Sequence, residues 1–281
     1  MTNKPNKLNS LDGQELLIWP STKKRIHLGD AFAAVSSGIY VAKMRNLNSI
    51  KLSIPYVHYR RGNLKFMKEV LNYFDLGGLE VEIVPFTEVP IASFPEAEAA
   101  GIRTVVQELR SMGIPPLIPD PRDPSKLIQG KTSSYDAPYC KLKITRAAEI
   151  QRKICYSWDA IYRKKEIPSN IELLTEALAE EFSGYELVQL GLPKTIEEDL
   201  RALSDCFFFI GFDSGMAHLC RFIGAPLVLL GNIGAFSEHA CERKVLEWKN
   251  VNDVWVNRTE LFTELREYLH KSYSNRDEIL L

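Results

Sequence analysis

The chain has 281 residues, of which 45% are hydrophobic and 25% are charged, and its formal net charge is −1. This composition is that of a globular protein with one large or two smaller domains, and the small net charge excludes a global positive field that would attract nucleic acid or anionic lipid. The polar N-terminus and the lack of an apolar run of 18 residues predict neither a signal peptide nor a membrane span, and hence a cytoplasmic protein without stable membrane insertion. The five cysteines form no Cys-x-x-Cys pair. We therefore expect reduced core thiols and no zinc site.

Strand and helix patterns alternate through the first half of the chain. Short apolar runs predict buried strands, and apolar positions that recur every three or four residues predict helices. The expected order is a strand at 15–20, a helix at 30–45, a strand at 50–56, a helix at 63–74 and a strand at 79–86. Such a βαβαβ unit implies parallel strands joined by right-handed crossovers.

This alternation stops after residue 87. The sequence predicts one helix over 96–111, and the stretch GIPPLIPDPRDPSK at 113–126 predicts a loop or linker because prolines and charges dominate it. A domain boundary is therefore expected between this stretch and residue 151. We place it so that residues 1–145 form one domain and residues 146–281 form another.

The second half begins the alternation again, and a Thr195-x-x-Glu198 pattern predicts a capped helix start within it. The expected elements are strands at 153–158, 185–191, 206–212 and 225–232 and helices at 169–182, 195–204, 214–223 and 257–273. Two halves of this kind predict an α/β protein with two Rossmann-like domains that face each other across a cleft.

The junction after the strand at 206–212 holds Asp213, Ser214 and Gly215. Ligands of open parallel sheets bind beyond the carboxyl ends of the strands, where helices begin. The unpaired amides and positive dipole end of such a helix suit a phosphate, and a glycine lets the ligand approach the backbone. The same Asp or Ser could instead only cap the helix, which is the commoner use of these residues.

The segment GFDSGMAHLCRFIGAPLVLLG resembles the C-terminal signature of the bacterial heptosyltransferase family, Gly-x-Asp-Thr/Ser-Gly-x-x-His followed by Gly-x-Pro. The matching positions are Gly211, Asp213, Ser214, Gly215, His218, Gly224 and Pro226. The resemblance implies a GT-B glycosyltransferase whose first domain mainly holds the acceptor and whose second mainly holds the sugar nucleotide. In the order of elements it extends over most of residues 13–270. The chain lacks a strand and a helix that the family usually has before the signature, so the donor's nucleotide and sugar are not carried over.

The resemblance also implies roles for single residues. Asp30, which follows Gly29, stands where the family has its general base, and Lys165, with Lys164 and Arg163 as alternatives, stands where a lysine neutralises the diphosphate. Glu197 or Glu198 would hold the ribose. The complete set of expected donor-binding residues is Lys165, Lys164, Glu197, Asp213, Ser214, Gly215, Met216 and His218. The carboxylates could equally serve as helix-start residues, and His218 could be a core histidine.

Basic residues follow the first two predicted strands, where they should face the cleft. We expect them to bind an anionic acceptor, with a lipopolysaccharide or other surface glycan core favoured over DNA that carries a hydroxylated base. They could also be ordinary solvated residues. The expected acceptor-binding residues are Lys24, Arg25, His27, Arg60 and Arg61.

The implied reaction is an inverting sugar transfer in which Asp30 deprotonates the acceptor hydroxyl. The sequence contains no Asp-x-Asp triplet, which predicts metal-independent chemistry with the nucleotide sugar as substrate and no further cofactor. Two other functions stay open. A non-catalytic nucleotide-sugar-binding protein would tolerate replacement of Asp30, and a nucleotide-sugar epimerase would need more acidic and histidine residues around the cleft than the sequence offers.

Overall fold

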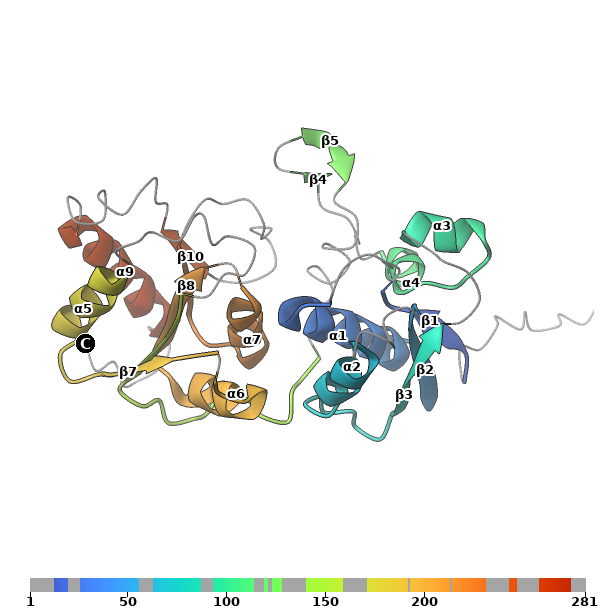
Figure 1. The fold of residues 1–281 in the computed structure, drawn as a ribbon, viewed down its shortest axis with the longest axis horizontal. Coiled ribbons are helices and arrows are strands. Elements are labelled where there is room, and N and C mark those ends of the chain that lie inside the picture. Colours follow the sequence, from blue (N-terminus) through green and yellow to red (C-terminus); the bar gives the residue numbers. More distant parts are fainter. Residues whose placement is uncertain are drawn as a thin grey trace, which may run out of the picture. The chain divides into compact units, whose positions relative to one another are not determined.

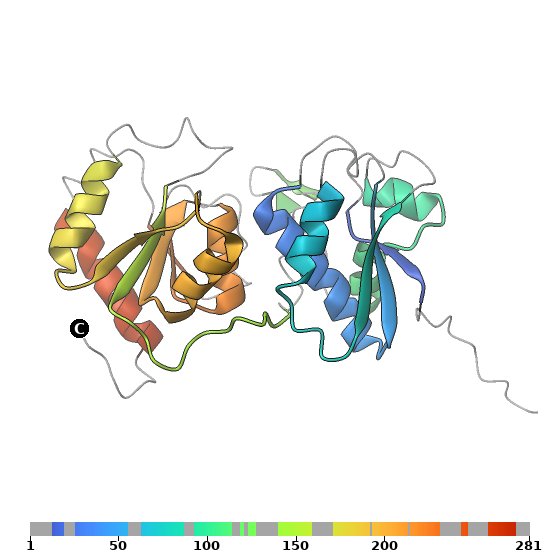
Figure 2. The ribbon, with the colours of Figure 1, turned by 60° about the horizontal axis from the view of Figure 1, so that its bottom comes forward.

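The chain divides into two compact units, Met1–Lys143 (unit 1) and Ile144–Leu281 (unit 2). Each unit is an α/β fold built on a parallel sheet, which confirms the predicted fold class (Figures 1 and 2). The computed structural model describes residues 13–19, 26–55, 63–86, 93–113, 119–120, 123–127, 140–158, 171–191, 193–212, 214–230, 243–246 and 258–273.

Unit 1 contains the predicted βαβαβ arrangement. Strands β1 (Glu15–Leu17), β2 (Ser49–Pro55) and β3 (Glu80–Phe86) pair in parallel in the order β1-β2-β3. Helices α1 (Leu28–Met44) and α2 (Asn63–Leu71) connect consecutive strands. Both helices lie on the same face of the sheet (Figures 1 and 2), as right-handed crossovers that advance in one direction require.

Helix α1 approaches the sheet closely at Gly38. A Cβ atom at this position would lie 2.6 Å from Leu52 Cδ2 and 3.2 Å from Ile18 Cγ2. The side chains of Ile18 and Leu52 therefore face α1, and Leu17 faces the opposite side, where it packs with Phe86 and Ala97.

The predicted helix at 96–111 is wrong, because two short helices occupy this range. Helix α3 (Phe94–Ala99) ends before Gly101, whose φ of +77° leaves the helical region. Helix α4 (Val105–Ser111) begins after Thr104, whose side chain accepts a hydrogen bond from the Gln107 amide at 3.1 Å. Thr104 forms a parallel bridge with Leu17 on the free edge of β1. The order of extended segments thus reverses at β1.

The proline-rich stretch after α4 also differs from the prediction of a loop. Strands β4 (Pro119–Asp120) and β5 (Asp123–Leu127) form a two-stranded antiparallel ladder within it. Proline is tolerated in such a ladder because each strand is an edge strand, and an edge strand needs its backbone donors on one side only.

Unit 2 is built on five parallel strands in the order β10-β9-β8-β6-β7. They are β6 (Lys153–Ser157), β7 (Glu186–Gln189), β8 (Phe208–Phe212), β9 (Leu227–Leu230) and β10 (Arg243–Leu246). Strand β10 was not predicted from the sequence. Its sequence, RKVL, has only two apolar residues, so it lacks the apolar run by which the other strands were found.

Helices cover both faces of this sheet. Helices α5 (Glu172–Glu181) and α9 (Arg258–Tyr273) lie on one face, and α6 (Ile196–Asp205) and α7 (Gly215–Ile223) lie on the other (Figure 2). On the first face, the ring of Phe182, the C-cap residue of α5, packs against Phe208 of β8 and Phe262 of α9, with ring centroids 5.4 and 6.3 Å apart. This aromatic contact joins both helices to the centre of the sheet.

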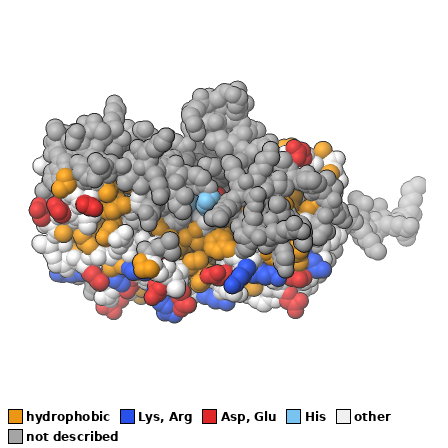
Figure 3. Space-filling view, viewed as in Figure 1, with side chains coloured by type: hydrophobic (Ala, Val, Ile, Leu, Met, Phe, Trp, Pro, Cys, Tyr) orange, Lys and Arg blue, Asp and Glu red, His pale blue; other side chains and the backbone are white. Residues whose placement is uncertain are grey.

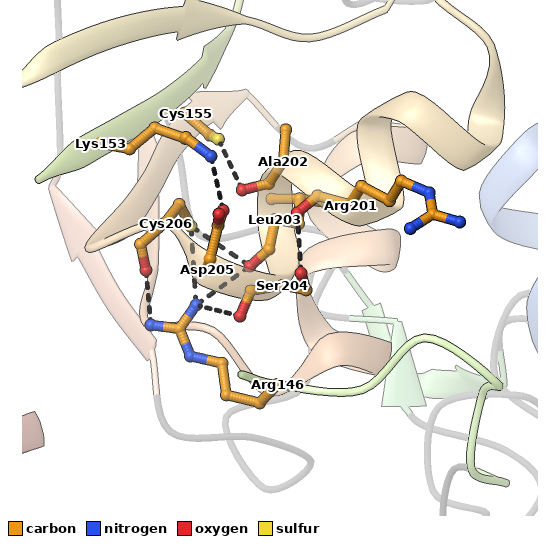
Figure 4. A network of polar contacts seen from close by, with 9 residues as sticks. All are labelled: Arg146, Lys153, Cys155, Arg201, Ala202, Leu203, Ser204, Asp205 and Cys206. Atoms are coloured by element: carbon orange, nitrogen blue, oxygen red, sulfur yellow. Dashed lines mark hydrogen bonds and ion pairs between the residues drawn. The ribbon is translucent and has the colours of Figure 1, made fainter. Parts of the chain in front are cut away.

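Arg146, near the beginning of unit 2, forms hydrogen bonds with the C-terminal end of α6 (Figure 4). Its guanidinium donates to the backbone oxygens of Leu203 at 3.0 Å, Ser204 at 3.3 Å and Cys206 at 2.5 Å. It also donates to the Tyr273 hydroxyl at 2.9 Å. The last carbonyls of a helix have no partner within the helix, so a cation that donates to them also complements the helix dipole. Arg146 therefore acts as the C-terminal cap of α6.

Replacement of Arg146 by Ala is expected to lower the free energy of unfolding of unit 2 by about 2–3 kcal/mol, because it leaves several helix-end carbonyls without their charged donor. The free energy of unfolding of R146K should lie between those of the wild type and R146A, since an ammonium cannot reproduce the fork of the guanidinium. Chemical denaturation measures these free energies. R201A is the control: Arg201 lies on α6 and forms an exposed ion pair with Glu197, and its loss should cost roughly 0.5 kcal/mol or less. Equal losses for R146A and R201A would contradict the assignment.

The described surface carries charges of both signs. On the face drawn in Figure 3, basic and acidic side chains are interspersed along the lower edge and are not sorted by sign. The described cysteines, Cys140, Cys155, Cys206 and Cys220, are buried, as expected for core thiols. No helix in the described part of the chain is long and apolar enough to cross a membrane.

Candidate functional site

The sheet of unit 2 has a topological switch point between β6 and β8. The chain passes from β6 through α5 to β7 on one side, and then through α6 back to β8 on the other side of β6. In open parallel sheets the ligand crevice lies beyond the carboxyl ends of the two strands at which the order reverses. Ser157 ends β6 and Ser214 follows β8 at this edge.

The N-terminus of α7 lies at this switch point and is not capped by the side chain of its N-cap residue. Ser214 occupies the N-cap position, but its side chain makes no capping hydrogen bond. The first backbone bond of the turn runs from the His218 amide to the Ser214 oxygen at 3.3 Å, so the amides of Gly215 and Met216 stand before it. Gly215 and Met216 are half-buried. Capping therefore does not explain Ser214, and an anion is the partner that such amides suit.

Two serine hydroxyls at the switch point have no hydrogen-bond partner in the described part of the chain. Ser157 is only 1% exposed, and neither its Oγ nor that of Ser214 has a hydrogen-bond partner among the residues that the structure describes. Leaving a buried hydroxyl unsatisfied costs about 1–3 kcal/mol. Such a cost is expected where a ligand supplies the missing partner. Ser157 was not predicted from the sequence, because a serine that ends an apolar run is indistinguishable from the ordinary end of a strand.

Gly211 lets strands β6 and β8 approach each other closely at the site. It is the register partner of Ser157, and a Cβ atom at Gly211 would lie 2.6 Å from the Ser157 backbone oxygen and 2.9 Å from Phe209 Cζ. No residue with a side chain fits there without a shift of the backbone of β6. The glycine that opens the heptosyltransferase-like signature thus has a packing reason in this chain.

Replacement of Ser157 by Ala is expected to leave the free energy of unfolding unchanged or higher, because it removes a buried hydroxyl that has no described partner. Affinity for a phosphate-bearing ligand should fall roughly tenfold to a hundredfold, since a hydrogen bond to a charged group contributes about 1.5–3 kcal/mol. Urea denaturation and isothermal titration calorimetry measure the two quantities. A less stable variant with unchanged affinity would make Ser157 a structural residue.

The other expected donor-binding residues are found in several settings. His218 is buried on α7 and is 5% exposed. Glu197 forms an exposed ion pair with Arg201 at 2.7 Å in the first turns of α6. Glu198 completes the predicted capping box with Thr195, which is confirmed, and the bond from the Thr195 amide lowers the pKa of Glu198. Lys164, Lys165 and Asp213 lie outside the described residues.

In unit 1 the expected general base lies in the first turn of α1. His27 is the N-cap residue of this helix, and the first bond runs from the Ala31 amide to the His27 oxygen at 2.8 Å. Asp30 is therefore inside the helix and is not its N-cap, and it is half-buried. The acceptor candidates Lys24, Arg25, Arg60 and Arg61 lie outside the described residues.

Asp30 also borders a reversal of strand order. Strand β1 has β2 on one side and the extended segment at Thr104 on the other, and α1 is the helix that follows β1. The N-terminus of α1 lies at the carboxyl edge because a crossover helix runs antiparallel to its strands. The unit therefore presents a carboxylate at the edge where α/β folds bind ligands. Among the described residues, no group of three or more His, Cys, Asp or Glu side chains could hold a metal ion.

No protein-family model matches the chain, and no curated protein matches it. Three similar solved structures are two from Escherichia coli and one from Veillonella parvula. The iron-containing dodecameric glycosyltransferase TibC of enterotoxigenic E. coli is 13% identical, with a TM-score of 0.45. A glycosyl transferase family 9 protein of V. parvula is 12% identical, with a TM-score of 0.46, and the ADP-heptose lipopolysaccharide heptosyltransferase II of E. coli is 15% identical, with a TM-score of 0.46.

The three matches cover different shares of this chain and of the solved proteins. The match covers 78% of this chain and 58% of TibC, so the chain spans less than two thirds of that protein. It covers 90% of this chain and 90% of the V. parvula protein, and 92% of this chain and 98% of the E. coli heptosyltransferase II. A structural likeness of this degree does not assign an activity. The activity has to be argued from the residues of the site.

Proposed function

We propose that the protein is a glycosyltransferase of the heptosyltransferase type, which transfers a sugar from a nucleotide-sugar donor to a hydroxyl of an anionic acceptor. One observation carries the proposal. The signature-like segment that contains Ser214, Gly215 and His218 begins α7 at the topological switch point of unit 2, where two buried serine hydroxyls have no described partner. Sequence motif and fold thus point to the same edge of the sheet.

The donor diphosphate is proposed to bind at the N-terminus of α7. The Gly215 and Met216 amides and the Ser157 and Ser214 hydroxyls would donate hydrogen bonds to its oxygens, and the helix dipole would favour its charge. Preorganised donors of this kind stabilise the charge that grows on the departing diphosphate. Lys165 or Lys164 would add a positive charge, and Glu197 would contact the ribose.

The chemical step assigned to Asp30 is proton removal. Its carboxylate accepts the proton of the acceptor hydroxyl while the hydroxyl oxygen forms a bond to the anomeric carbon and the bond to the diphosphate breaks. The nucleoside diphosphate leaves with the electron pair of that bond. Attack opposite to the leaving group inverts the anomeric configuration. No step assigns a role to a metal ion, so transfer should continue in the presence of EDTA.

The acceptor is proposed to be anionic because basic residues follow the first two strands of unit 1. A lipopolysaccharide or other surface glycan core is favoured, and DNA with a hydroxylated base is the other acceptor of this charge. Lys24, Arg25, Arg60 and Arg61 would contact its phosphates or carboxylates, and His27 at the start of α1 would lie beside Asp30.

Slow hydrolysis of the donor without any acceptor tests the proposal. A panel of UDP-, ADP-, GDP- and CMP-linked sugars is incubated with the protein, and release of the nucleotide and the configuration of the freed sugar are followed by NMR. Hydrolysis of one donor with inversion is expected. Binding without hydrolysis would indicate a non-catalytic binding protein, an epimerised nucleotide sugar would indicate an epimerase, and retention of configuration would contradict the role of Asp30.

A further inference from the structure

A buried carboxylate holds the turn between β7 and α6. Asp199 lies in the first turns of α6 and is only 2% exposed. Its Oδ1 and Oδ2 accept from the Gly191 amide at 3.1 and 3.2 Å. Gly191 has a φ of +98°, a conformation that side-chain-bearing residues rarely adopt. The amide is thus turned toward α6 by an unusual backbone conformation and is held there by a carboxylate.

Helix capping does not account for Asp199. The start of α6 already has a complete capping box, in which Thr195 accepts from the Glu198 amide and Glu198 accepts from the Thr195 amide. Burial raises the pKa of Asp199, while the bond from Gly191 and the charge of Lys194 oppose this rise. A carboxylate that is costly to bury and unnecessary as a cap is expected where it fixes a functional segment.

The turn that Asp199 holds lies beside the candidate donor site. Gln189 is the register partner of Tyr156, and the Leu190 amide donates to the Tyr156 oxygen at 2.8 Å. Gly191 therefore follows directly after the last rung between β7 and β6, next to the strand end that Ser157 forms. The Gly191 amide that Asp199 binds and the Ser157 hydroxyl, which has no described partner, therefore lie at neighbouring strand ends.

The same turn carries a cation. The Lys194 amide donates to the Gly191 oxygen at 2.9 Å, and the Lys194 ammonium donates to the Gln189 oxygen at 2.7 Å. An ammonium has three donors, so one backbone contact leaves others for a ligand. Lys194 is half-buried, and the turn restricts its position at the carboxyl end of β7.

We propose that Asp199 is a positioning residue of the donor site, which acts through Gly191 to hold Lys194 where its ammonium contacts a nucleoside diphosphate. The proposal rests on the proposed function, because it needs a donor at the β6 and β8 strand ends. It adds a cation to the site that neither the motif nor the resemblance indicates. Asp199 itself touches no ligand.

The test is isothermal titration calorimetry of ADP, UDP and GDP with the full-length protein and four variants. D199A is expected to weaken binding of the preferred nucleotide roughly tenfold to a hundredfold, as misplacement of a contact does. D199N keeps an acceptor for the Gly191 amide and should restore most of the affinity. K194A should weaken binding by a similar factor, and D199A/K194A should be no weaker than the weaker of the two single variants, because both changes remove one contact.

D205A is the matched control. Asp205 ends the same helix and pairs with Lys153 at 2.6 Å, at the edge of the sheet opposite to the candidate site. D205A should lower the midpoint of unfolding without a change in nucleotide affinity. Amide hydrogen exchange of the ligand-free protein adds a second measurement, since exchange at Gly191 should accelerate in D199A and stay slow in D199N and D205A.

The outcomes separate the two proposals. If the wild-type protein binds a nucleotide and D199A and K194A bind it equally well, Asp199 is a structural residue and only the positioning role is overturned. Additive effects of D199A and K194A would also overturn it. If the wild-type protein binds none of the three nucleotides, the proposed function fails and the positioning role fails with it. Should D199A not fold, Asp199→Ser takes its place in the same comparisons, because its shorter side chain should not reach the Gly191 amide.

Discussion

Asp30→Asn is expected to lower the turnover number of sugar transfer by a factor of about 10²–10⁴, which is the usual contribution of a general base. The amide has nearly the same shape as the carboxylate but cannot accept the proton of the acceptor hydroxyl. Asp30 lies in unit 1, whereas the proposed donor-binding residues lie in unit 2, so nucleotide affinity should not change. Initial rates of transfer and calorimetric titration of the released nucleotide measure the two quantities.

Glu96→Gln is the matched control for Asp30. Glu96 also lies in the first turn of a helix of unit 1, α3, and carries the same charge. The E96Q variant should leave the turnover number and the nucleotide affinity unchanged. A turnover number of D30N within a factor of about three of that of E96Q would remove Asp30 from the chemistry.

Gly211→Ala is expected to lower the free energy of unfolding of unit 2 by about 1–3 kcal/mol, the usual cost of overpacking a core, and more if β6 cannot shift. The new methyl group would lie 2.6 Å from the Ser157 backbone oxygen. Because Ser157 borders the proposed donor site, the same change should weaken nucleotide binding. Urea denaturation followed by calorimetric titration of the folded fraction tests both expectations.

A second variant identifies the atom that causes the clash. Phe209 Cζ lies 2.9 Å from the same Cβ position, so F209L/G211A removes the ring contact and leaves the contact with the backbone oxygen. The free energy of unfolding that G211A removes should be nearly as large in the F209L background as in the wild type. The reason is that the Ser157 oxygen belongs to the β6 ladder, whereas the ring is the more mobile neighbour. Full recovery would show that the ring and not the strand spacing requires glycine at this position.

Regular elements were predictable where hydrophobic periodicity agrees with the final packing. Helix α1 and the parallel strands β2 and β3 were found this way, whereas the capped start of α6 was found from its Thr195-x-x-Glu198 pattern. The predicted helix at 96–111 was wrong because its apolar periodicity continues across Gly101, where the backbone leaves the helical region. Strand β10 was missed because its two apolar residues give no periodic signal.

The candidate site was predictable only in the part that is contiguous in sequence. Ser214, Gly215 and His218 form a recognisable segment, and strand-to-helix order alone places it at a carboxyl strand end. Ser157 and Asp199 were not predictable. Their significance comes from the register of β6 with β7 and β8 and from hydrogen bonds between separate elements, and a single sequence contains no information on either.

The most direct test of the central claim is a thermal-shift screen of the wild-type protein and D213A against UDP, ADP, GDP, CMP and their common sugar conjugates. A ligand that binds only the folded state raises the unfolding midpoint by mass action. The account predicts a shift with one nucleotide family that is lost in D213A. No shift with any of these ligands, or an equal shift in D213A, would contradict a donor site at the N-terminus of α7.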